Sequence, residues 1–289
     1  MDIETPPTTL ASRERIIRPR KGLVAIDFEE LWRYRELFVF LAWRDILVRY
    51  KQTYIGIAWA VVQPFLTMVV FTVVFGILAG QSEKQGIPFP EYAVMTLAAL
   101  LPWQFFSNAM RETSNSVIGN AQMISKIYFP RLIVPSSAVL SGTADFLIGF
   151  VILLGIMLWA GVAITAKLLL LPFFFILAFF AAFGVGLWLS ALNVKYRDVK
   201  YIVPFMTQMG LYISPVGFVT TIVPWNWRVW YDLNPMVVVI DGFRWCVLGA
   251  DRYEPLWPML WVSTVLVFVL VASGALFFRS SEKTFADVI

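Results

Sequence analysis

The sequence predicts an all-α integral membrane protein with six transmembrane helices. Its 289 residues are 59% hydrophobic and only 15% charged, and the mean hydropathy is +0.74. Soluble domains carry about 25% charged residues, so a soluble globular fold fits this composition poorly. Six long apolar runs, and an alternation of basic residues between them, complete the prediction.

The six apolar runs define the predicted spans. A helix needs roughly 20 apolar residues to cross about 30 Å of hydrocarbon, and lipid leaves its backbone groups no other hydrogen-bonding partner. The second and fifth runs are the weakest because they carry polar side chains. The predicted spans are residues 57–79, 92–114, 136–160, 168–191, 199–219 and 257–278.

The lysines and arginines between these runs predict the orientation. Eighteen of the 23 fall in segments on one side of the membrane, and five fall on the other. Because basic loops stay in the cytoplasm, both termini are expected there. An even number of spans agrees with this orientation.

The segments outside the spans divide the chain further. Residues 1–25 lack the apolar core of a cleavable signal peptide and are expected to form a mobile cytoplasmic tail. Residues 26–40 are expected to form an amphipathic interface helix, since Leu31, Tyr34 and Phe38 oppose charged side chains at helical spacing. Residues 41–280 form the transmembrane domain, and residues 281–289 a second cytoplasmic tail.

The residue types present argue against an enzyme. The chain has no histidine, one cysteine (Cys246) and no clustered acids, so neither catalytic nor metal-binding residues are predicted. No glycine is followed by lysine, which excludes a Walker A loop. Any energy from ATP must therefore come from a partner.

Three spans carry aromatic and small polar side chains at helical spacing. Aromatic faces stack on the C–H faces of sugar rings, and hydroxyls and amides exchange hydrogen bonds with sugar hydroxyls. A passage for a hydroxylated polymer is one interpretation; helix packing with interfacial aromatic belts is the other. The candidate lining residues are Trp59, Gln63, Thr67, Phe71, Tyr92, Trp103, Ser107, Tyr201, Phe205, Gln208 and Tyr212.

Asp145 is the one acid expected deep in a span. It lies nine residues into the third run, roughly 14 Å at helical rise, with Ser141 and Gly149 on its face. A carboxylate in a membrane is functional or paired, and without a relay of further acids the paired, structural role is favoured.

Two connections are too long to be simple turns. The inner one contains the sequence KIYFPR, whose aromatics are expected either in the groove of a partner or at the lipid headgroups. The outer one, 220–256, contains a helical stretch near 235–248 that is too short to span and is expected to cap the outer face.

Several separated motifs resemble the permease subunits of polysaccharide ABC exporters of the ABC-2 type. This group, with the type V fold, exports lipid-linked O-antigen, capsule and teichoic acid chains. The resemblance covers about residues 30 to 280. The motifs are WRDILVRYKQTYIGIAWAVVQP at 43–64, KIYFPRLIVP at 126–135, LNVKYRDVKYIVPF at 192–205, SPV at 214–216 and LNPM at 233–236.

The resemblance implies partners for the chain. It implies a homodimer in the bacterial inner membrane, joined to two copies of a nucleotide-binding ATPase that binds ATP and Mg. It implies a lipid-linked polysaccharide as substrate, with O-antigen lipopolysaccharide as the first expectation. A smaller lipid or drug is the alternative substrate, and a membrane acyl or glycosyl transferase is the rival class.

The resemblance also assigns roles by position. It implies ATPase coupling and a cytoplasmic gate at Lys126, Tyr128, Phe129, Pro130 and Arg131. It implies a cytoplasmic mouth at Arg44, Asp45, Arg49, Tyr50, Lys51, Tyr196, Arg197 and Asp198. It implies an outer gate at Trp225, Trp227, Asn234, Pro235 and Arg244.

Overall fold

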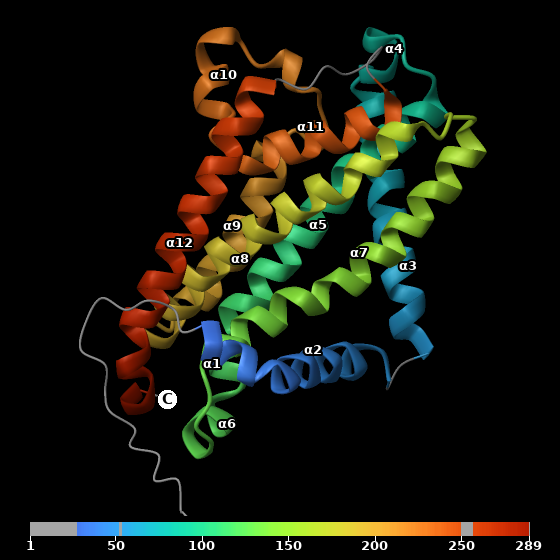
Figure 1. Cartoon of the computed structure of the whole chain (residues 1–289). Helices are drawn as coiled ribbons and strands as arrows, with labels where there is room; N and C mark the ends of the chain where they lie inside the picture. Colours follow the sequence, from blue (N-terminus) through green and yellow to red (C-terminus); the bar gives the residue numbers. More distant parts are fainter. Residues whose placement is uncertain (1–27, 52–53, 250–256, 289) are drawn as a thin grey trace, which may run out of the picture.

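The computed structural model describes residues 28–51, 54–249 and 257–288, and every element in those ranges is helical. The longer helices run lengthwise through one bundle (Figure 1). They are α3 (Tyr54–Phe71, continued by the π-helix η1, Thr72–Leu78), α5 (Phe89–Gly119), α7 (Ile133–Ala160), α8 (Leu171–Lys195), α9 (Val199–Ile213) and α12 (Trp257–Val288).

Shorter helices cover the two ends of the bundle (Figure 1). One end, called the α2 end below, carries α1 (Phe28–Arg33), α2 (Arg35–Tyr50) and α6 (Ala121–Lys126). The opposite end, called the α10 end, carries α4 (Gln81–Gln85), η2 (Ala166–Leu170), η3 (Thr220–Ile222), α10 (Trp225–Tyr231) and α11 (Pro235–Leu248).

Helix α5 lies at the centre and packs chiefly against α7 and α8, with α11 crossing near its start. Aromatic rings join these helices: Phe175 of α8 lies 4.8 Å from the ring of Phe105 and 4.1 Å from that of Phe146. Such contacts add to the burial of their apolar area. The phenylalanine-rich fourth run is thus a packing helix on this side.

Helix α8 passes closely between α5 and α12 because of two glycines. A Cβ on Gly184 would lie 2.9 Å from the backbone carbon of Leu270, and one on Gly186 would lie 2.6 Å from Cγ2 of Thr113. Small residues let helix backbones approach in this way. Gly184 and Gly186 therefore set the close spacing of α8 with α12 and α5.

Among the described residues, four helices are long and apolar enough to cross a membrane: Ala58–Leu78, Ile133–Ala160, Ala166–Lys195 and Met259–Lys283. The two runs predicted to be weakest are absent from this set. Helix α5 packs against α7, α8 and α11, which bury most of its length, including several of its polar side chains. Helix α9 is only about 22 Å long at 1.5 Å per residue, and Pro215 follows its end instead of the expected continuation to 219.

Other boundaries also differ from the predictions. Helices α1 and α2 continue to Tyr50, ten residues beyond the expected end of the interface helix. Helix α12 continues to Val288, and Phe285 packs on Phe278 at 5.3 Å, so most of the predicted tail 281–289 is helical. The predicted tail 1–25 and Ile289 lie outside the described residues.

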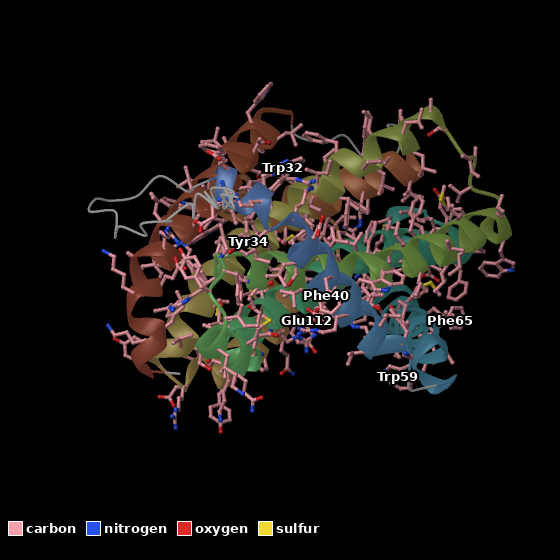
Figure 2. All side chains as sticks on the ribbon, turned by 60° about the horizontal axis from the view of Figure 1, so that its bottom comes forward. Trp32, Tyr34, Phe40, Trp59, Phe65 and Glu112 are labelled. Carbon is pink, nitrogen blue, oxygen red and sulfur yellow. The ribbon has the colours of Figure 1, made fainter. Side chains whose placement is uncertain are left out.

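Helices α1 and α2 have two apolar faces. The predicted face, with Leu31, Tyr34 and Phe38, packs on the protein core at the α2 end. A second face is exposed and carries Trp32 and Phe40, which Figure 2 labels. Trp43 is exposed as well. Exposed tryptophans on a helix across the end of a bundle are typical of a membrane interface.

Candidate functional site

A polar cavity of about 290 Å³ lies where α2, α3, α5 and α7 meet. It joins two sets of residues that the sequence placed in separate groups. Trp59 and Gln63 come from the predicted lining of α3, and Arg49 and Tyr50 come from the predicted mouth at the end of α2. Its other lining residues include Gln104, Asn108 and Asp145.

An ion network forms one wall of this cavity. Arg49 pairs with both Glu112 of α5 and Asp145 of α7, and the hydroxyl of Tyr50 donates to Asp145. The Ser141 hydroxyl donates to Glu112 at 3.0 Å. In Figure 2, α2 crosses this end of the bundle beside Glu112 on its way to α3 and Trp59.

The network holds its arginine charged. Burial alone would lower the pKa of Arg49, but the carboxylates of Glu112 and Asp145 outweigh it and raise that pKa. Burial, followed by the hydrogen bond to Asp145, raises the pKa of Tyr50, so its hydroxyl keeps its proton. One arginine facing two carboxylates leaves the wall with an excess of negative charge when both are ionised.

The network supplies the partners of Asp145, the acid that was expected inside the third span. Asp145 was expected to have a partner, and α2 supplies two because it crosses beside the first half of α7. Sequence reasoning missed Glu112. Its signal in the sequence is the charged pair Arg111–Glu112 near the end of the second predicted span. Arg111 was counted with the basic residues of the following loop, so the pair was not considered as part of the span.

The predicted lining residues of α3 and α9 lie on open faces of the chain. Trp59 is 57% exposed and Tyr212 is 58% exposed. Gln63, Tyr201, Phe205 and Gln208 are also exposed, whereas Thr67 and Phe71 are half-buried. Aromatic and amide groups thus line both helices on faces that no other part of the described chain covers.

The predicted lining residues of α5 are instead buried. Tyr92 is 1% exposed and lies over Gly76, where a Cβ would come within 2.9 Å of the ring. Trp103 lies over Gly210 of α9, where a Cβ would come within 2.5 Å of Cη2. Ser107 is buried as well and donates to a backbone carbonyl of its own helix. These three side chains pack the bundle in the single chain, so the prediction that they line an open face is wrong for this structure.

The open face of α5 is the neighbouring one. It carries the half-buried Gln104 and Asn108, each one position after a predicted residue, and the exposed Arg111 and Asn115 further along; it is called the α5 stripe below. One residue turns a helix by about 100°. The prediction followed the large aromatic Trp103, but Gly210 gives that ring a packing site and turns the amides outward.

The other residues of the predicted mouth remain near the surface of the α2 end. Arg44 pairs with Asp45 at 2.7 Å and donates to Asn120 Oδ1 at 3.0 Å. The remaining members are exposed: Lys51, Tyr196, Arg197 and Asp198.

The predicted coupling segment divides into an exposed and a buried half. Tyr128 is 66% exposed, and Lys126 is exposed beside it. Phe129 is 4% exposed because it packs with Leu41 and Phe278 in the core of the α2 end, and Pro130 is also buried. Arg131 donates to the carbonyl of Glu282. Phe129 therefore fills this core, and the expectation that it is seated in a partner's groove is wrong for this structure.

The predicted outer-gate residues have mixed surroundings at the α10 end. Trp227 is exposed, and the Asn234 side chain caps α11 by accepting from the Met236 amide at 3.0 Å, with Pro235 in the first turn. The side chain of Trp225 lies outside the described residues.

Arg244 lies in the interior of the α10 end. It is fully buried and donates to the carbonyls of Phe218 at 2.9 Å and Val216 at 3.0 Å. It thus ties α11 to the segment that follows α9. No surface of Arg244 is exposed for an outer gate.

The chain matches the family model described as ABC-2 type transporter over residues 36–248. The chain belongs to the ABC-2 type transporter family. It is a multi-pass membrane protein and a transporter subunit rather than an enzyme, and the ATPase of such a system is a separate subunit.

Three relatives show the range of this similarity. The O-antigen export system permease protein RfbA of Myxococcus xanthus is 25% identical over 262 residues, covering 90% of this chain and 98% of the relative. The protein of the same name from Klebsiella pneumoniae is 26% identical, covering 88% and 95%. The polysialic acid transport protein KpsM of Escherichia coli is 23% identical, covering 71% and 78%.

Proposed function

We propose that this permease pairs with a second copy of itself and forms a passage through which a partner ATPase drives a lipid-linked polysaccharide, of the O-antigen kind, across the bacterial inner membrane. The carrying observation is the pair of open faces on α3 and α9, which present Trp59, Gln63, Tyr201, Phe205, Gln208 and Tyr212. The relatives named for export of O-antigen and polysialic acid support the substrate class.

The chemistry of these faces suits a sliding sugar chain. Aromatic rings contact the C–H faces of sugars without direction along the chain, and amides and hydroxyls exchange hydrogen bonds with passing hydroxyl groups. Each contact is weak, so no single position holds the polymer. The α5 stripe adds amides to this surface, in place of Tyr92, Trp103 and Ser107.

The proposed assembly places the α2 end in the cytoplasm. The excess of basic residues on that side supports this orientation, with α5 and α9 as the remaining two of six spans, enclosed by the dimer. The ATPase, which binds ATP and Mg, docks at the exposed half of the coupling segment, Lys126 and Tyr128. Helices α10 and α11 form an outer gate whose surface includes Trp227.

Alanine substitutions on α3 and α9 test the proposal. Trp59→Ala and Tyr212→Ala should each lower polymer at the cell surface by about tenfold, because each removes a stacking platform. Permease levels should stay unchanged. The readout is quantitative surface labelling of the polymer with an immunoblot of the permease.

Trp261→Ala is the matched control, because Trp261 is an exposed tryptophan on α12, on a helix apolar enough to face lipid. Its export should equal that of the wild type. Equal export by all three variants would remove the proposed lining. Export of a small lipid by the complex, with no polymer at the cell surface, would favour the smaller-substrate exporter.

A further inference from the structure

We propose that Arg111 on the α5 stripe is a phosphate-binding residue, which receives the phosphate group that links a lipid anchor to the exported polymer. This inference rests on the proposed function and gives it a recognition point. Arg111 is the one cation of the α5 stripe. It follows Gln104 and Asn108 along α5, and both of these amides line the polar cavity.

The side chain of Arg111 is oriented by its own helix. Its Nε donates to the carbonyl of Ser107 at 3.3 Å, and its Nη2 donates to Asn108 Oδ1 at 2.6 Å. Both acceptors lie toward the start of α5, so the guanidinium points along the stripe toward the cavity and away from the α2 end. An arginine that reaches for headgroups at the α2 end would point the opposite way.

The guanidinium keeps donors available for a ligand. An arginine has five N–H donors, and two of these are used by Ser107 and Asn108. Within the described ranges, no carboxylate lies at ion-pair distance from Arg111. The neighbouring Glu112 is engaged by Arg49 and Ser141 on another face of the helix.

These features select an anion with several oxygens. The planar guanidinium binds phosphate through two parallel hydrogen bonds, and the contact to Asn108 fixes the plane of the group beforehand. Two sources of phosphate are compared for this position, the headgroups of the bilayer and the linkage of the proposed lipid-anchored substrate. The direction of the side chain favours the substrate linkage.

A thiol-protection experiment tests the site in the whole complex with its ATPase. A Gln104→Cys permease places a thiol on the cavity wall next to Asn108, and the native Cys246 is buried. In phosphatidylcholine vesicles, inorganic pyrophosphate should slow labelling of this thiol by a neutral thiosulfonate reagent by about tenfold. No slowing at millimolar pyrophosphate would overturn the proposal.

Two further variants assign the protection to Arg111. Combined with Gln104→Cys, Arg111→Gln should abolish it and Arg111→Lys should keep only part, since lysine lacks the planar fork. Arg33→Gln is the control, because Arg33 is exposed on α1 and paired with Glu29; its protection should equal that of the parent. Protection that survives Arg111→Gln would also overturn the proposal.

Vesicles containing phosphatidylglycerol separate the two phosphate sources. If labelling of the Gln104→Cys thiol is slowed in these vesicles without pyrophosphate, Arg111 binds bilayer headgroups and the proposal is contradicted. The experiment needs no polymer export, so it fails or succeeds independently of Trp59→Ala and Tyr212→Ala. Protection together with unchanged export by those variants would keep the phosphate site and remove the proposed lining.

Discussion

Helices α5 and α9 carry similar sets of aromatic side chains at helical spacing, but the structure uses them in opposite ways. Tyr92 and Trp103 of α5 are buried, whereas Tyr201 and Tyr212 of α9 are exposed. The difference lies in the residues opposite. Tyr92 meets Gly76 and Trp103 meets Gly210, whereas no glycine of the described chain lies against Tyr201 or Tyr212.

The contrast between α5 and α9 indicates how packing aromatics can be distinguished from aromatics available to a substrate. A glycine opposite a large ring leaves room for that ring between two helices, so such a pair marks a packing position. The exposed rings of α9 remain for lipid, a second copy or a ligand. The predictions below test the buried side of this comparison against the exposed side.

The largest effect is expected where α2 meets the buried side. Arg49→Ala leaves Glu112 and Asp145 facing each other without their cation, which should lower the free energy of unfolding by about 3 kcal/mol or more. Thermal unfolding of the purified permease in detergent measures this. Arg33→Ala removes only an exposed pair and should change stability by less than about 1 kcal/mol.

The two tryptophans on opposite sides give the sharpest contrast. Trp103→Ala should cost about 3 kcal/mol, since it leaves a cavity above Gly210. Trp59→Ala should stay within about 0.5 kcal/mol, because its ring is largely exposed. Melting curves of the two variants decide the point. Equal losses would mean that the exposed face of α3 is a packing surface after all.

A smaller effect is expected from the glycine itself. Gly210→Ala sets a methyl group against the ring of Trp103 and should cost about 1–3 kcal/mol. Gly155→Ala in α7 is the control, since a Cβ there meets nothing within 4 Å and alanine favours a helix. Gly155→Ala should be neutral or stabilising in the same melting assay. A stable Gly210→Ala protein would refute the packing role of that glycine.

Much of the architecture could be predicted from the sequence because hydropathy dictates which segments become long helices. Helix α11 occupies Pro235–Leu248, where a helical stretch was expected near 235–248, and the aromatic and amide side chains predicted on α9 are exposed on that helix. The face of α5 was misplaced by one residue. Periodicity reports that side chains share a face, but only the neighbouring helix decides whether the face is covered.

The site was predictable in its parts and not in its assembly. Arg49, Tyr50, Trp59 and Gln63 were all singled out, but nothing in their spacing shows that they border one cavity. The partner of Asp145 depends on where α2 crosses α7, which is a long-range property. Phe129 was misjudged for a similar reason, since its burial depends on Leu41 and Phe278, which are distant in the chain.

The ion pairs of Arg49 with Glu112 and Asp145 couple the movements of three helices. One side chain near the end of α2 pairs with an acid on each of two long helices, α5 and α7. A movement of α2 would therefore displace α5 and α7 at the same time through Arg49. The walls of the cavity on α5 and α7 would then shift together relative to α3.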